Sequence, residues 1–134
     1  MPRSFSSLAF LLCVVLAASG CGGSSKPAVC KKRDDLKSSV NNLIDVNPVS
    51  DGVSEVETRL SDVQQKTRDL AAAAGDQFKP EVAALQQSTA KVASDVKALG
   101  GSDKASALGA LGSDLPAVRT SLDELLTAVG SVCD

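Results

Sequence analysis

Hydrophobic residues after residue 30 recur at steps of three and four, the spacing that lines one face of an α-helix. Four such stripes are separated by helix breakers, at Asn47-Pro48, at Gly75 and at Gly100-Gly101. The stripes consist of Leu36, Val40, Leu43 and Ile44; Val53, Val56, Leu60, Val63, Thr67, Leu70 and Ala74; Phe78, Val82, Leu85, Thr89, Val92, Val96 and Leu99; and Leu108, Leu111, Leu115, Val118, Leu122, Leu125, Val129 and Val132. No segment shows sustained alternation of apolar and polar residues. The pattern therefore predicts an all-α domain.

Side chains that can cap a helix precede the last three stripes. The candidate caps are Ser50 or Asp51, Asp76, and Ser102 or Asp103. Gly109, Gly112 and Pro116 interrupt the fourth stripe, so we expect the last helix to be kinked or split near Ser113. The first helix should span about 15 residues and the others more than about 20. One end of the domain is then expected to be incompletely covered.

Composition excludes several kinds of chemistry. The chain contains no His, Trp or Tyr, and Phe78 is its only aromatic residue after residue 20. Catalysis by a histidine base, histidine-ligated zinc and aromatic stacking on nucleic-acid bases are therefore not expected. Residues 21–134 carry 13 basic and 16 acidic side chains, a balance that does not predict nucleic-acid binding. We expect no cofactor and no metal.

The acidic residues also do not indicate an active site. Carboxylates cluster at Asp34-Asp35, Glu55/Glu57 and Asp123-Glu124. Adjacent side chains on a helix diverge by about 100°, so these carboxylates should not converge on one point. Four-residue spacing instead predicts surface ion pairs, namely Glu55 with Arg59, Asp62 with Lys66, and Lys91 with Asp95. We therefore expect a protein that is not an enzyme.

The N-terminus has the layout of an export signal. Arg3 precedes the apolar run 8–18, which is too short to span a bilayer as a permanent helix. Ala18-Ser19-Gly20-Cys21 resembles the cleavage site of bacterial lipoproteins, although Ala18 stands where that class usually has Leu. The resemblance implies cleavage before Cys21 and a diacylglyceryl group on its sulfur. A secreted protein without lipid is the alternative, because small residues also suit ordinary signal cleavage.

Cysteine counting bears on this choice. If Cys13 leaves with the signal, Cys21, Cys30 and Cys133 remain, and an exported protein with three thiols keeps one unpaired. Lipidation of Cys21 would leave Cys30 and Cys133 to form a disulfide. Such a bridge closes a loop of about 104 residues and stabilises by at most about 4.7 kcal/mol. A redox-active or metal-binding role for Cys30 and Cys133 is not indicated, because the sequence contains neither a CxxC spacing nor a histidine.

The disulfide also selects the number of helices. Bridging requires the two Cα atoms to lie within about 7 Å, which an even number of antiparallel helices allows. We therefore predict an up-down four-helix bundle with coiled-coil-like packing and neighbouring termini, rather than three helices. A monomer is expected, with self-association through a second face as the alternative.

These features predict three segments and a location. Residues 1–20 form a signal peptide, 21–29 a lipidated N-terminus and flexible tether, and 30–134 the helical domain. Four basic residues near the anchor are candidate contacts for anionic lipid, namely Lys26, Lys31, Lys32 and Arg33. We expect a lipoprotein on the extracytoplasmic face of the cell membrane, with a structural role or an envelope protein or lipid as partner. A carrier of an apolar ligand is the alternative.

Overall fold

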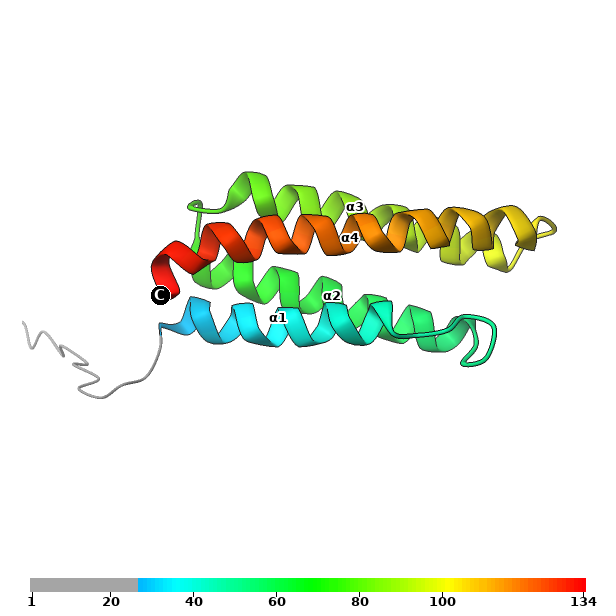
Figure 1. Ribbon diagram of the computed structural model, residues 1–134, viewed down its shortest axis with the longest axis horizontal. Helices are drawn as coiled ribbons and strands as arrows, with labels where there is room; N and C mark the ends of the chain where they lie inside the picture. Colours follow the sequence, from blue (N-terminus) through cyan, green and yellow to red (C-terminus); the bar gives the residue numbers. More distant parts are fainter. Residues whose placement is uncertain (1–26) are drawn as a thin grey trace, which may run out of the picture.

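The computed structural model describes residues 27–134, and these residues form four α-helices and no strand. The helices are α1 (Ala28–Ile44), α2 (Val53–Ala74), α3 (Lys79–Leu99) and α4 (Lys104–Cys133). Each helix packs against two others, in the closed order α1, α2, α3, α4 and back to α1. The prediction of an all-α four-helix bundle is confirmed. Figure 1 shows the four helices lying along one long axis.

The interior is formed by the predicted stripes, which pack together in one core. Leu36, Val63, Leu85 and Leu125, one from each helix, are completely buried. The buried leucines and valines exclude water along the bundle axis, which is the main force that holds such helices together. Thr67 and Thr89 lie in the same core, where each hydroxyl donates to a carbonyl oxygen of its own helix.

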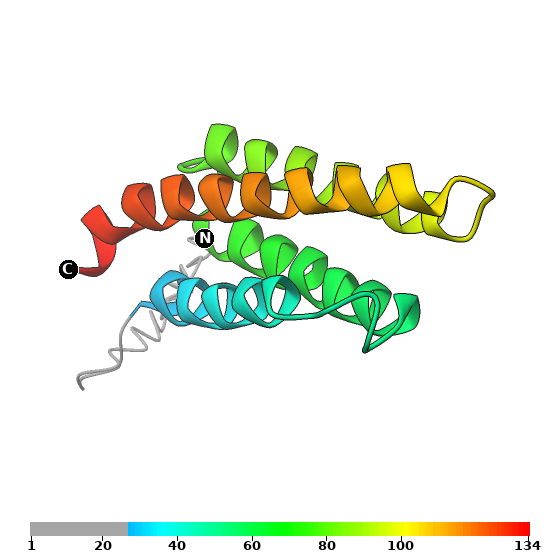
Figure 2. The same ribbon diagram turned by 45° about the vertical axis from the view of Figure 1, so that its right-hand side comes forward.

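The disulfide between Cys30 and Cys133 joins the first turn of α1 to the end of α4. The two Cα atoms lie 5.6 Å apart, so the predicted pairing and the neighbouring ends of the domain are confirmed. The connection 75–78 lies at this same end in Figures 1 and 2, while the connections 45–52 and 100–103 lie at the opposite end. The bundle therefore has a disulfide end and a loop end.

Two predicted caps are wrong and one is confirmed. Gly52 and Phe78 precede α2 and α3 and give no side-chain cap, because Asp51 accepts a hydrogen bond from the Asn47 backbone and Asp76 pairs with Lys79. Asp103 caps α4 by accepting from the amide of Ser106 at 3.3 Å. Gly75 ends α2 with φ +63°, as a glycine stop requires.

The last helix is not split. Pro116 lies inside α4, which continues from Lys104 to Cys133, and Gly109 and Gly112 are helical as well. Leu111 and Val118 are buried on either side of the proline, and this packing outweighs the local cost of the breakers. The expectation of a split near Ser113 is therefore wrong.

The helical domain also begins slightly earlier than residue 30. Helix α1 starts at Ala28, after Pro27, and Val29 packs into the core. Two residues assigned to the tether thus belong to the bundle. The proposed signal, Cys21 and Lys26 lie outside the described residues. No helix among residues 27–134 is both long enough and apolar enough to pass through a bilayer.

Candidate functional site

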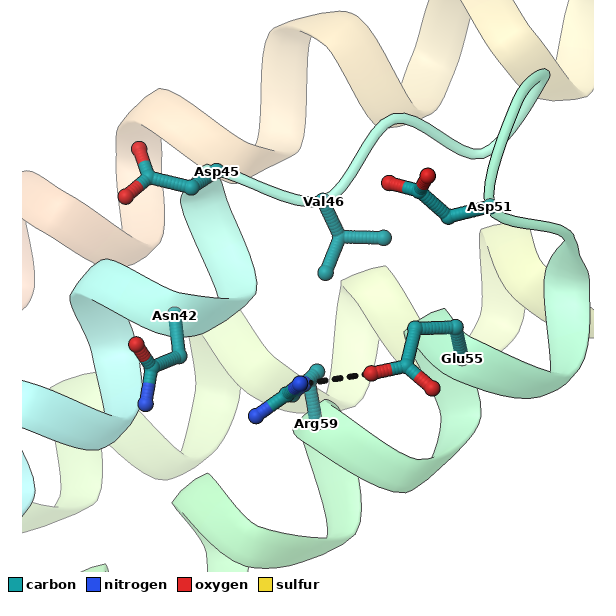
Figure 3. Close-up of a pocket in the computed structure, with 6 residues that line it drawn as sticks. All are labelled: Asn42, Asp45, Val46, Asp51, Glu55 and Arg59. Atoms are coloured by element: carbon teal, nitrogen blue, oxygen red, sulfur yellow. Dashed lines mark hydrogen bonds and ion pairs between the residues drawn. The ribbon is translucent and has the colours of Figure 1, made fainter.

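An open hollow of about 490 Å³ lies at the loop end, beneath the connection 45–52. Its walls are Asn42, Asp45, Val46, Asp51, Glu55 and Arg59, all shown in Figure 3. Helix α1 has 17 residues against 22 in α2, so the connection rather than a helix covers this part of α2. The hollow is thus a consequence of the short first helix.

The connection above this hollow is held by local hydrogen bonds. The Asn47 side-chain oxygen accepts from the amides of Val49 and Ser50, at 2.9 and 3.4 Å. The Asp51 carboxylate accepts from the Asn47 amide at 2.9 Å, and the Asp51 amide donates back to the Asn47 carbonyl at 2.8 Å. These bonds form an Asx-type turn that leaves Val49 77% exposed.

The hollow is acidic and partly neutralised. Arg59 Nε donates to Glu55 Oε1 at 2.7 Å, which confirms the predicted pair, while Asp45 and Asp51 add two further carboxylates. The pair is half exposed, so it contributes no more than about 1 kcal/mol to stability. The six wall residues include no hydroxyl or thiol that could act as a nucleophile.

A second open hollow, of about 610 Å³, lies between α3 and α4. It is lined by Glu81, Thr120, Asp123, Glu124, Thr127 and Ala128. Asp123 and Glu124 thus both line this open hollow, from neighbouring positions on α4. Five of the six side chains that line each hollow are polar or charged.

The basic residues at the disulfide end are largely paired. Lys32 Nζ lies 3.8 Å from Asp69 on α2, and Arg33 lies 3.1 Å from Asp34 and 3.9 Å from Asp134 beyond α4. These contacts join α1 to both of its neighbours. Lys31 is exposed and forms no ion pair with any residue of the described part. Of the predicted lipid contacts within 27–134, Lys31 is thus the most available.

Two of the predicted surface ion pairs do not form among the described residues. Asp62 accepts a hydrogen bond from the buried Ser39 hydroxyl of α1 instead of pairing with Lys66. A buried hydroxyl without a partner is costly, which explains the preference for Asp62. Asp95 is likewise not paired with Lys91.

Asp95 instead faces Asp114 across the α3–α4 interface. Burial, followed by a hydrogen bond and charge repulsion from the Asp114 carboxyl, raises the pKa of Asp95 above its ordinary value. One oxygen of Asp95, Oδ2, is enclosed by protein and has no hydrogen-bond partner among residues 27–134. Sequence reasoning missed this pair, because its two members are 19 positions apart and meet only through the register of α3 against α4.

Comparison with known proteins adds no identification. No protein family, no curated protein and no solved structure matches the chain. Within residues 27–134, no group of three or more His, Cys, Asp or Glu side chains is placed to hold a metal ion. The function must therefore be argued from the residues themselves.

Proposed function

We propose that this protein is an exported, lipid-anchored bundle with a non-enzymatic structural or binding role at the bacterial cell envelope. The observation that carries the proposal is the pairing of Cys30 with Cys133. Of the three cysteines in residues 21–134, that pairing leaves Cys21, which follows Ala18-Ser19-Gly20 in the lipoprotein-like signal. The disulfide itself suits an exported protein, because the cytosol keeps most thiols reduced.

The position of the helical domain supports the anchor. Five residues, 22–26, separate Cys21 from Pro27, and a chain rises by at most about 3.3–3.6 Å per residue. A lipid on Cys21 would hold the start of α1, seven residues further along the chain, within about 25 Å of the membrane. The disulfide end would then face the lipid headgroups, and the hollow under 45–52 would face away from them.

The available partners differ at the two ends. Lys31 at the disulfide end, together with Lys26, would contribute about 1 kcal/mol each near anionic lipid. The loop end presents Val49 beside the acidic hollow. We propose that the lipid contact lies at the first end and that a protein partner, if one binds, uses the second.

Labelled fatty acid and cell fractionation test the anchor. The full-length chain expressed in a bacterial host should incorporate label and sediment with membranes, whereas Cys21→Ser should lose the label. Cys13→Ser is the matched control, because it removes a cysteine of the proposed signal and should leave labelling intact. Retention of label in Cys21→Ser, or absence of label from the wild-type chain, would contradict the proposal.

The disulfide variant separates anchoring from folding. A chain carrying both Cys30→Ser and Cys133→Ser should still be labelled and membrane-bound, since its signal and Cys21 are unchanged. If the double variant loses the label while the wild-type chain keeps it, incorporation of the fatty acid requires the disulfide-bonded bundle and not the signal alone.

A further inference from the structure

The bundle consists of two helical hairpins, α1–α2 and α3–α4, which meet along a seam formed by the α2–α3 and α1–α4 interfaces. Helix α1 packs more extensively on α2 than on α4, and α3 packs more extensively on α4 than on α2. Hydrogen bonds also join the helices within each hairpin. The Ser39 hydroxyl donates to Asp62 in the first hairpin, and the hydroxyls of Ser88 and Ser121 lie 2.7 Å apart in the second. Each hairpin is thus held together by both packing and polar contacts.

The α2–α3 side of the seam lacks such polar contacts. A hollow of about 190 Å³ lies there, lined by Gln64, Thr67, Arg68, Gln86 and Thr89. A second hollow, of about 250 Å³, lies next to it along the same interface. Thr67 and Thr89 are buried, but each hydroxyl donates to a carbonyl of its own helix. Within residues 27–134, no side-chain hydrogen bond or ion pair joins α2 to α3.

Two covalent links join the hairpins, and both lie at the disulfide end (Figures 1 and 2). The connection 75–78 joins α2 to α3, and the bridge between Cys30 and Cys133 joins α1 to the end of α4. Arg33 and Asp134, 3.9 Å apart, form the one ion pair that crosses the seam in the described part of the chain. The two covalent links hold both sides of the seam closed. Without the bridge, the four-residue connection 75–78 is the only covalent link between the hairpins.

We infer that the Cys30–Cys133 disulfide is a latch that an external dithiol can open. A thiolate of the dithiol attacks the sulfur of Cys133, which is partly exposed, and forms a mixed disulfide. Cys30, which is fully buried, leaves as a thiolate and takes up a proton from water. The second thiol of the reagent, as a thiolate, then displaces Cys133. The dithiol is thereby oxidised to a disulfide, and both cysteines are reduced.

Release of the latch lets the two hairpins separate about residues 75–78. The separation exposes the buried side chains along the seam, while the α1–α2 and α3–α4 interfaces stay closed. Such partial opening follows the weakest interface of a fold and needs less free energy than complete unfolding. A general loss of stability would instead open all four interfaces together. The inference does not depend on the lipid anchor.

Cysteine labelling of the full-length chain distinguishes these two cases. Thr67→Cys places a thiol at the seam, where the native side chain is buried and lines the α2–α3 hollow. Ser39→Cys is the matched control, because Ser39 is equally buried but bonds to Asp62 within the first hairpin. Each variant is made with the disulfide intact and together with Cys30→Ser and Cys133→Ser. Peptide mass identifies the alkylated position, so Cys21 does not interfere.

Loss of the disulfide should raise the alkylation rate at position 67 by about tenfold or more and change the rate at position 39 much less. Thr89→Cys, on the α3 side of the same hollow, should respond as Thr67→Cys does and serves in its place if Thr67→Cys fails to fold. Equal increases at positions 39 and 67 would indicate complete unfolding and overturn the latch. Unchanged rates at positions 67 and 89 would overturn it as well.

The wild-type chain tests the chemical step. Glutathione is a monothiol and completes only the first exchange, so acid quenching should trap it on Cys133. Peptide mass locates the adduct. Glutathione on Cys30, or no adduct on either cysteine, would contradict a latch that opens by attack at Cys133.

Discussion

Leu85 of α3 shows how far single residues control the stability of this bundle. Its side chain is fully buried in a core made chiefly of leucines and valines. We predict that Leu85→Ala lowers the free energy of unfolding by about 2–5 kcal/mol, because it removes buried surface and leaves a cavity. Denaturant unfolding of the full-length chain measures this loss.

Leu108 of α4 is the matched control. It is 37% exposed, so Leu108→Ala should cost less than about 1 kcal/mol. Equal costs for the two variants would show that the core is not where the structure places it.

Leu108 also shows where a sequence stripe stops being reliable. The stripe placed Leu108 and Val132 in the core, but both are more than one-third exposed, and Ala107 is buried beside Leu108. A straight helix drifts by about 20° per heptad against a strict seven-residue repeat. Helix α4 has 30 residues, so a stripe that faces the core at the middle of the helix is rotated away from the core at both ends.

Helix α4 contains glycines that its fold does not need. Gly109 and Gly112 are exposed, helical and free of neighbours at the Cβ position. We predict that Gly109→Ala and Gly112→Ala each raise the free energy of unfolding by about 0.5–1 kcal/mol, because alanine loses less backbone entropy in a helix. Thermal unfolding followed by circular dichroism checks the gain.

Gly75→Ala should have the opposite effect. Gly75 ends α2 with φ +63°, a conformation that a Cβ disfavours although space is free around it. If Gly109→Ala or Gly112→Ala destabilises the chain as Gly75→Ala does, the account of α4 as one continuous helix is wrong.

At the scale of elements, the sequence predicted the helices better than the contacts between them. Hydrophobic spacing is local, so it located all four helices and the stop at Gly75. Whether a side chain caps a helix depends on the other groups that compete for it. The Asp51 carboxylate accepts a hydrogen bond from the Asn47 amide and does not cap α2. The Asp95–Asp114 pair depends on the register between two helices, which no spacing within one helix records.

The disulfide acts on the whole molecule because it joins the two ends of the bundle. We predict that combining Cys30→Ser with Cys133→Ser lowers the free energy of unfolding by about 2–5 kcal/mol, since the unfolded chain regains the freedom of a long loop. Equilibrium unfolding of the variant and of the wild-type chain, with and without reductant, measures the loss. Cys21→Ser should leave the free energy of unfolding unchanged, and reductant should not alter the stability of the double variant.

The fold was predicted from features of the whole chain, whereas the proposed function rests on the Cys30–Cys133 pairing together with a short signal before Cys21. Cys30 and Cys133 could be paired from sequence because few cysteines remained once Cys21 was assigned to the lipid. The short first helix and the incompletely covered end were predicted from the sequence, but the residues that line the hollow under 45–52 were not, because they come together only through the turn at 45–52 and the packing of α1 on α2. Neither hollow carries a combination of groups that specifies a ligand.

The most direct test of the central claim is a non-reducing intact mass of the full-length product extracted gently from host membranes. The account predicts the mass of residues 21–134 plus a diacylglyceryl adduct, less two hydrogens for the Cys30–Cys133 bridge. A soluble product without an adduct, beginning at Gly20 or Cys21, would contradict the lipid anchor and leave Cys21 in need of another partner.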